Sequence, residues 1–397
     1  PGHWAEQPKL ASRRSVLYRT TFSLPNDPST DDGRHWLVFD GIWQSADVWL
    51  DGAYLGPTDG WFIPNEFDIT DQIHTSETGD HVLAVEVMSQ QPNADEPTRN
   101  LNGIFDDPDI VGHQNRGGIW QPVRIVSTGP VRMIKNRLVC TEASTTAAKV
   151  HMRSHLVSDE SRSVTITTTL RPPGGAPPVV SSRQHDLASG ATVLEWDLAI
   201  TDPQLWWPWQ LGDQPMYRVT VSVEVNGSIS GIWERTVGLR QIRMKNYVLW
   251  INGERLFAKG VDMWPTTTLP ADATPEQISG DVARAKDLGL NLLRVESHVA
   301  RPELYDAADR AGMLIWQDMP MRGEVKRSIQ SNAVNAAHRL VDKLGAHPSI
   351  AVWCAHYDPT GTSTGRHPLT AIPSRRSVFS VAKQQTPTWT KSVLDRL

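Results

Sequence analysis

The sequence has few cysteines, no long apolar run and no excess of positive charge. Its two cysteines, Cys140 and Cys354, lie far apart and lack metal-ligand spacing, so neither a disulfide framework nor a zinc site is indicated. Both are predicted to be buried small apolar residues. No segment approaches the roughly 18 consecutive apolar residues that span a bilayer, which argues against a membrane partner. The formal net charge of -5 gives no support for a nucleic-acid partner.

The length, the first residue and the tryptophan content each limit the interpretation. A chain of 397 residues is expected to hold two or three domains. It starts at Pro1, without an initiating Met or a signal-type apolar stretch, so we expect the true amino terminus to be missing, and no compartment follows from the sequence. The 16 tryptophans are unusually many. Most are expected in the core, although flat indole faces also suit the CH-rich faces of sugar rings.

Residues 1–128 show short alternating strands separated by turn residues, which predicts an all-β sandwich. The clearest strands are residues 36–39, 46–50 and 81–87. Asp51-Gly52 follows the second of them and predicts a hairpin turn.

Residues 129–241 predict a second β module, of a size that suits an immunoglobulin-like sandwich. Residues 163–170 and 217–225 carry β-branched side chains on alternate positions, as half-buried strands do. The Pro- and Gly-rich segment 172–178 is predicted to be a loop between strands, because strand signals resume after it.

From residue 242 onward the pattern changes to strands that alternate with helices. A hairpin over 248–257 turns at Asn252-Gly253, and the strands that follow are predicted at 257–261, 291–295, 313–317 and 350–354. Helices are predicted at 274–288, 302–310 and 333–344. Repeated βα units imply a parallel sheet. Because a (β/α)8 TIM barrel needs roughly 250 residues, residues 242–397 predict an incomplete barrel of about four βα units in a fragment, and a smaller open α/β domain is the alternative.

The carboxyl ends of parallel strands are expected to meet on one face, where barrels place their chemistry. The polar and aromatic residues at these ends are Asp262, Arg294, Glu296, Trp316, Gln317, Asp318, His356, Tyr357 and Asp358. Such a set suits a polyhydroxylated ligand, since carboxylates and arginine make paired hydrogen bonds with adjacent hydroxyls and tryptophan stacks on a sugar ring. No phosphate-binding glycine loop, Ser-His-Asp signature or His-Glu metal motif competes, so no cofactor and no metal are predicted.

Each of these residues also has a structural interpretation. Arg294 and Glu296 could form a salt bridge with each other, and Trp316 could pack inside the barrel. Asp358 follows the apolar strand 350–353 after an abrupt switch to polar residues, which is where a catalytic carboxylate is expected, but it could also simply open a turn before Pro359.

Several short segments carry a resemblance to a known family: 46–56 with 67–70, 117–123, 205–208 with 217–219, Asn252-Gly253 with 259–261, Arg294, and 312–318. Together with the order of the three parts, they resemble glycoside hydrolase family 2, and among its members the β-mannosidases and exo-β-glucosaminidases more than the β-galactosidases and β-glucuronidases. The resemblance covers nearly the whole chain, and it implies that the sandwich of residues 1–128 is of the jelly-roll, sugar-binding type.

The resemblance implies a retaining, exo-acting β-glycosidase, with Asp358 at the acid/base position and a carbohydrate as substrate. In this family a Glu that follows an Asn at the end of strand four protonates the leaving oxygen, and a carboxylate from strand seven attacks the anomeric carbon. Here Tyr357 and Asp358 stand at the Asn and Glu positions, and Glu296 replaces an expected aromatic residue or His. No strand seven is present. The chain alone is therefore expected to be impaired or inactive.

Two alternatives remain. The chain could be a non-catalytic carbohydrate-binding relative or truncated pseudoenzyme, or a β-sandwich interaction protein whose half barrel, with two raw sheet edges, is unfolded. The loop 103–115 of the first sandwich carries Asp106, Asp107 and Asp109. In relatives a loop in this region can reach over the barrel mouth, so Asp107 and Asp109 are predicted sugar ligands, with a solvated loop as the alternative.

Overall fold

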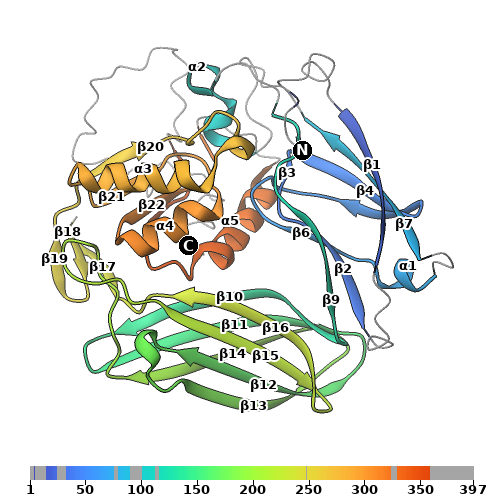
Figure 1. The fold of residues 1–397 in the computed structure, drawn as a ribbon, viewed down its shortest axis with the longest axis horizontal. Coiled ribbons are helices and arrows are strands. Elements are labelled where there is room, and N and C mark those ends of the chain that lie inside the picture. The colour runs from blue at the N-terminus through green and yellow to red at the C-terminus, as the bar shows by residue number, and fades with distance from the viewer. Residues whose placement is uncertain are drawn as a thin grey trace.

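The computed structural model describes residues 4, 15–24, 33–75, 79–89, 101–111, 116–246, 248–322 and 329–357. Figure 1 shows three groups of elements: a first β-sandwich in blue, a second in green and yellow, and an α/β part in orange. None of the helices in these ranges combines the length and the apolar character needed to cross a bilayer.

The first sandwich consists of antiparallel strands whose apolar faces pack together. One sheet has the order β1(Ser15–Ser23)-β7(Asp80–Met88)-β4(Ser45–Leu50)-β5(Ala53–Pro57), a second β6(Asn65–Asp68)-β2(Arg34–Phe39)-β9(Val123–Thr128), and a short third pairs β3(Ile42–Trp43) with β8(Gly118–Ile119). Along β4, Ala46, Val48 and Leu50 alternate into the core, where they meet Leu37 and Phe39 of β2. The predicted turn at Asp51-Gly52 joins β4 to β5, with φ of 51° and 83°. Helix α1(Thr70–Thr75) completes this part.

The second sandwich also has two antiparallel sheets around one core. They are β10(Val131–Ala143)-β11(Ala147–Ser158)-β14(Gly190–Thr201) and β13(Val179–Leu187)-β12(Arg162–Arg171)-β15(Tyr217–Val225)-β16(Ser228–Val237). The predicted loop 172–178 lies between the paired strands β12 and β13 and contains the short 3-10 turn η4(Pro173–Gly175), so it is not a domain linker.

The α/β part begins with a small sheet, β17(Ile242–Lys245)-β18(Val248–Ile251)-β19(Glu254–Leu256), which turns at Asn252-Gly253 as predicted. A four-stranded parallel sheet follows in chain order: β20(Gly260–Met263), β21(Leu292–Val295), β22(Leu314–Asp318) and β23(Ile350–Cys354). The connections are η5(Pro270–Asp272) with α3(Pro275–Asp287), α4(Pro302–Ala311) and α5(Gln330–Leu344). The predicted alternation of strands and helices is therefore present in the described residues.

The start of α3 follows from its local sequence. The Thr274 side chain accepts a hydrogen bond from the backbone N–H of Gln277, and the Gln277 side chain accepts one from the backbone N–H of Thr274. This capping box satisfies two donors that a helix start leaves open. Ile278, Val282 and Ala285 form the buried face that packs on the sheet.

The first strand of the parallel sheet was predicted three residues too early. Its ladder starts at Gly260, which lies opposite Leu292, and not at Phe257, whose surface is 81% exposed. The reason is the Asn291 side chain, which accepts a hydrogen bond from the Lys259 backbone N–H and donates one to the Phe257 carbonyl. The Lys259 N–H and the Phe257 carbonyl are therefore hydrogen-bonded to this side chain and not to a neighbouring strand.

Aromatic residues of the first sandwich share one apolar core with the helices of the α/β part. Trp43, Trp61 and Phe105 contact one another with ring centroids 4.4 to 5.3 Å apart, in the same cluster as buried residues of α3, α4 and α5. Lys343 of α5 also donates a hydrogen bond to the Phe62 carbonyl. The two parts are thus joined by apolar and polar contacts.

The second sandwich contacts the amino-terminal end of the parallel sheet. The Arg240 guanidinium is buried and donates hydrogen bonds to the carbonyls of Pro348 and Ile350, at the start of β23. The Trp206 indole donates one to the carbonyl of Asp309 in α4. These hydrogen bonds fix the amino-terminal end of the sheet. A functional site is therefore expected at the carboxyl-terminal end.

Candidate functional site

The carboxyl ends of β20 to β23 form the candidate site, called here the strand-end site. Register places Asp262, Arg294 and Trp316 side by side on adjacent strands. Two residues beyond Trp316, Asp318 of β22 lies opposite Cys354 of β23. Because the strands are parallel and in register, residues distant in sequence meet on one face.

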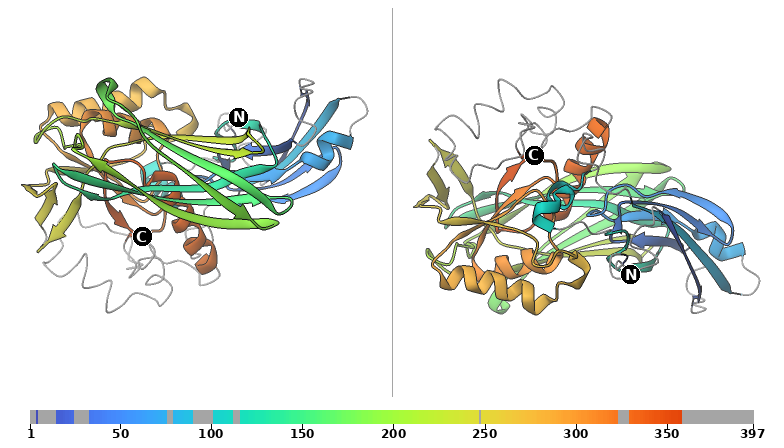
Figure 2. Two further views of the ribbon diagram at one scale, coloured as in Figure 1. Left: turned by 90° about the horizontal axis from the view of Figure 1, so that it is seen from below. Right: turned by 90° about the horizontal axis from the view of Figure 1, so that it is seen from above.

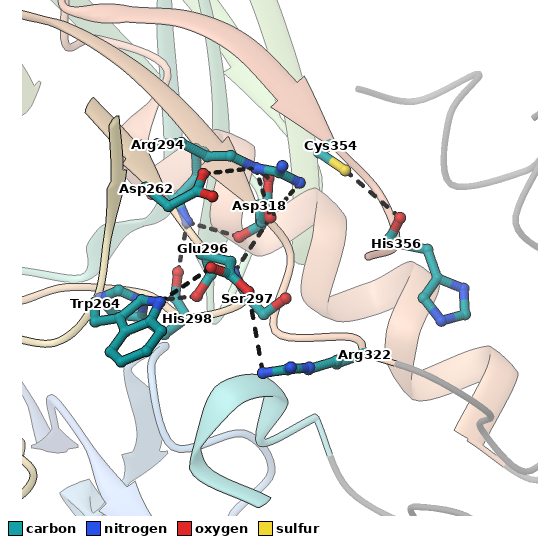
Figure 3. Close-up of polar contacts among 11 residues, drawn as sticks. Asp262, Trp264, Arg294, Glu296, Ser297, His298, Asp318, Arg322, Cys354 and His356 are labelled. Carbon is teal, nitrogen blue, oxygen red and sulfur yellow. Dashed lines mark hydrogen bonds and ion pairs between the residues drawn. The ribbon is translucent and has the colours of Figure 1, made fainter. Parts of the chain in front are cut away.

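The centre of the strand-end site is an ion pair between Arg294 and Asp318 (Figure 3). The arginine Nε donates to both carboxylate oxygens at 3.2 Å, and its Nη2 donates to Oδ2 at 2.9 Å. The Asp318 side chain is fully buried, and this burial raises its pKa to about 6, although Arg294 acts to lower it. For Arg294, burial acts to lower the pKa, but the adjacent carboxylate outweighs it and the pKa is raised. The paired hydrogen bonds fix the guanidinium plane.

Asp262 lies on the open side of this pair. Its Oδ1 is 4.0 Å from the Nε of Arg294, and its side chain is 54% exposed. Arg294 is held much closer by Asp318, so Asp262 is an accessible carboxylate that its neighbour neutralises only weakly.

Glu296 is a buried carboxylate beside this pair. Its Oε2 accepts a hydrogen bond from the Trp264 indole at 3.1 Å, and its Oε1 lies 4.0 Å from Nη1 of Arg322. Figure 3 shows Trp264 and Arg322 approaching Glu296 from different sides. The sequence allowed a salt bridge between Arg294 and Glu296. Among the ion pairs of the described residues, Arg294 pairs instead with Asp318 and Asp262.

Two guanidinium groups flank the ring of Tyr357. Arg294 and Arg322 have their Cζ atoms 5.1 and 5.3 Å from the ring centroid, and Arg294 also lies 5.1 Å from the ring of Trp316. Burial raises the pKa of the Tyr357 hydroxyl. Trp316 packs against the apolar cluster that contains Leu292 and Leu314. It therefore has the packing role that was the structural alternative to sugar contact.

The turn after β21 is held from outside the sheet. Ser297 has φ 48°, its N–H donates to Asp318 Oδ2 at 3.3 Å, and its carbonyl accepts from the N–H of Ile104 at 3.0 Å. His298 is also buried, which lowers its pKa to about 4, and its Nδ1 donates to the Glu296 carbonyl. A neutral His298 and the Ser297 amide thus fix the backbone turn that lies next to the carboxylates of Glu296 and Asp318.

Ile104 belongs to η3(Gly103–Asp106), which with α2(Pro108–Val111) comes from the first sandwich. Figure 2 shows these elements in teal against the orange α/β part. Gly103 has φ 57°, and a Cβ atom there would lie 1.8 Å from the Ser297 carbonyl oxygen. Only glycine allows this approach.

The same segment contributes charge to the strand-end site. Asp107 Oδ2 lies 3.1 Å from Nη2 of Arg322. Asp109 is exposed, and its N–H donates to the side chain of Asp107. Burial raises the pKa of Asp106 to about 6, against the opposing effects of Asn102 and Arg116. A direct sugar contact by Asp107 or Asp109 stays a prediction.

The structure brings together most of the predicted set. The residues that meet are Asp262, Arg294, Glu296, Trp316, Asp318 and Tyr357. The His356 ring points away from the carboxylates (Figure 3), while its carbonyl accepts from the Cys354 thiol. Gln317 lies on the other face, bonded to Tyr305 and to the His298 carbonyl. Asp358 lies outside the described residues, as do residues 112–115 of the predicted loop.

Sequence reasoning missed Trp264 and Arg322. Trp264 follows Asp262 by two positions, which on an extended chain is the same face, so strand periodicity could have found it. Arg322 gave no comparable signal, because it lies beyond the end of β22, where an isolated bridge to Tyr357 places it beside the site.

A separate group of Asp306, Asp309 and His347 has ligand atoms within 4.8 Å of one another. It lies at the opposite end of β23. Asp309 accepts from His347 Nδ1 at 2.7 Å and from the Ser349 N–H at 3.1 Å. These bonds explain the group as support for the start of β23, so we assign it no metal.

Comparisons with known proteins identify the first two parts. The family model described as "Glycosyl hydrolase 2 galactose-binding domain-like" matches residues 5–119, and that described as "Glycosyl hydrolases family 2" matches residues 134–240. The chain belongs to glycoside hydrolase family 2. Similar proteins of family 2 cover more of this chain than the two family models do. An exo-β-D-glucosaminidase of Streptomyces avermitilis is 26% identical over 322 residues, which is 77% of this chain and 34% of the relative. A β-mannosidase B of Emericella nidulans is 24% identical over 388 residues, 87% of this chain and 44% of the relative.

Solved structures of family 2 members have the same fold. A β-D-mannosidase from Dictyoglomus thermophilum superimposes with a TM-score of 0.74 at 21% identity, covering 89% of this chain and 46% of that one. A putative β-galactosidase from Bacteroides fragilis gives 0.74 at 21% identity, covering 86% and 50%. The family 2 chain thus spans half or less of the length of these relatives.

Proposed function

We propose that this family 2 chain is the sugar-binding part of a retaining, exo-acting β-glycosidase. In this proposal residues 1–128 are the galactose-binding-like sandwich, 129–241 the immunoglobulin-like sandwich, and 242–397 the first half of a TIM barrel. The similarity to family 2 glycosidases over most of the chain supports it. The terminal sugar of a β-glycoside would bind over the carboxyl ends of β20 to β23.

The observation that carries the proposal is the arrangement around Arg294. A guanidinium held by Asp318 lies between the open carboxylate of Asp262 and the ring of Trp316. Trp264, 51% exposed, stands at the same edge. Fixed donors and acceptors next to aromatic faces are what a ring with several hydroxyls requires.

The proposed chemistry assigns the acid/base position to Asp358. A retaining mechanism needs a second carboxylate about 5–5.5 Å away as nucleophile. By resemblance that residue belongs to a seventh strand, whereas the parallel sheet of the described residues has four strands. Asp is one methylene shorter than Glu, so its proton falls roughly 1.5 Å short, and a misplacement of about 1 Å costs on the order of 100-fold in rate. Residues 1–397 are therefore expected to bind a sugar without hydrolysing it.

A second candidate is a non-catalytic carbohydrate-binding protein. It is favoured by Tyr357, which replaces the family's Asn. Its ring is fixed between Arg294 and Arg322. A ring in this place fills space that the Asn side chain would leave for the sugar hydroxyl next to the anomeric carbon.

Calorimetric titration of methyl β-D-glycosides tests where the sugar binds. Arg294→Lys keeps the charge but loses the paired geometry, and we expect it to weaken binding about tenfold, or roughly 1.4 kcal/mol. Arg310→Lys, an exposed position in the last turn of α4, is the matched control. Equal affinity in the wild type and in Arg294→Lys would place the sugar elsewhere.

A further inference from the structure

Acidic groups outnumber basic ones among the described side chains of the strand-end site. The carboxylates are Asp107, Asp262, Glu296 and Asp318, and the guanidinium groups are Arg294 and Arg322. The whole protein has only a slight negative excess for its size. The local imbalance is therefore a property of this site.

Both guanidinium groups are already engaged by carboxylates. Arg294 makes three hydrogen bonds to Asp318. Arg322 pairs with Asp107 at 3.1 Å and lies 4.0 Å from Glu296. An anionic substituent on a sugar would have to displace one of these partners and would meet the remaining carboxylates at short range, which costs free energy.

The negative charge that remains accessible lies on Asp262. Its side chain is 54% exposed, and the nearest described cation, Arg294, is 4.0 Å away and committed to Asp318. Two residues further along the chain, Trp264 is 51% exposed and is oriented by its indole bond to Glu296. A carboxylate beside an oriented indole ring is a combination that attracts an ammonium group, through ion pairing and cation–π attraction.

We infer that the strand-end site prefers a cationic sugar, an amino sugar in a β-linkage, over neutral and anionic ones, with Asp262 and Trp264 as the residues that set this preference. The inference rests on the proposed function, because it concerns the substrate class of the same site. It extends that proposal from a general β-glycoside to glycosides with a protonated amine.

Titration of the complete chain with three ligands tests this preference. Methyl β-D-glucosaminide and methyl β-D-glucoside differ only in carrying an ammonium or a hydroxyl group at one carbon, and methyl β-D-glucuronide carries a carboxylate. We expect the glucosaminide to bind roughly three- to tenfold more tightly than the glucoside, and the glucuronide to bind most weakly. The advantage of the glucosaminide should shrink as salt is added, since the accessible charge is screened.

Two variants locate the source of the preference. Asp262→Asn keeps the shape of the side chain and should bring the glucosaminide to the affinity of the glucoside. Asp287→Asn removes the same charge from the exposed last turn of α3 and should leave the preference intact. Equal binding of glucosaminide and glucoside by the wild type, or tightest binding of the glucuronide, would overturn the inference and leave the proposed function standing. Failure of all three glycosides to bind would overturn the proposed function itself.

Discussion

Asp107 of the first sandwich forms an ion pair with Arg322 of the α/β part, with 3.1 Å between Oδ2 and Nη2. Arg322 in turn lies against the ring of Tyr357 and near Glu296. The first sandwich therefore takes part in the strand-end site through a charged contact as well as through packing.

Asp107→Asn is expected to weaken sugar binding through this contact. Arg322 would lose its closest partner, and the dissociation constant for a methyl β-D-glycoside should rise about three- to tenfold, since a partly buried ion pair contributes roughly 1 kcal/mol. Asp287→Asn, at an exposed position in the last turn of α3, should have little effect. Unchanged affinity in both variants, measured by calorimetry, would exclude this segment from the site.

Gly103→Ala should destabilise the fold and disturb the strand-end site together. A Cβ atom would meet the Ser297 carbonyl oxygen at 1.8 Å, on a backbone with φ 57°. We expect a loss of about 2–3 kcal/mol in the free energy of unfolding, measured with urea. Gly174→Ala is the control, because Gly174 has φ 75° but no atom within 4 Å of an added Cβ, so only the backbone strain of about 1 kcal/mol applies. Equal losses in the two variants would show that the close approach to Ser297 has no energetic role.

Residues 1–397 should release no nitrophenol from aryl β-glycosides above background. Activity that Asp358→Ala abolishes would contradict this expectation and show that the 397 residues suffice for catalysis. In a polypeptide that joins these residues to a complete barrel, the double change Tyr357→Asn with Asp358→Glu should raise the turnover, because it restores the reach of the acid and the contact to the sugar hydroxyl. No increase would mean that these two positions have been assigned wrongly.

The pKa of Asp318 makes its contribution to stability dependent on pH. This pKa of about 6 in the folded state exceeds the value of about 4 for an unfolded Asp, so the folded state holds the proton more tightly. Protonation should therefore stabilise the fold as the pH falls from about 6 to 4, by up to roughly 2–3 kcal/mol, and this contribution is lost as the pH rises through 6. Urea unfolding of the wild type and Asp318→Asn across this range gives the difference. A difference that instead grew with rising pH would show that Arg294 keeps the carboxylate ionised.

The elements of the α/β part could be predicted from sequence because their signals are local. The capping box at Thr274 begins α3 and the left-handed Gly312 ends α4, and both signals lie within a few residues of the helix ends. Gly345 follows α5 directly, with an ordinary helical φ of -63°. Since strands of a parallel sheet must place their carboxyl ends together, the approach of Arg294 to Asp318 could be expected as well.

The rest of the strand-end site depends on tertiary contacts that leave no periodic signal. Arg322 pairs with Asp107 because a segment of the first sandwich packs beside the strand ends. The start of β20 depends on hydrogen bonds from Asn291, thirty or so residues away. The orientation of His356 away from the carboxylates likewise follows from the path of the chain after β23 (Figure 3).

The aromatic cluster of Trp43, Trp61 and Phe105 has an evolutionary consequence, because it belongs to the same core as the helices of the α/β part. A crossover between relatives that replaced only the first sandwich would mismatch the two sides of this core. Chimaeras should therefore fold only when the donor supplies the sandwich and α3 to α5 as one block, and gene shuffling in this lineage should inherit them together.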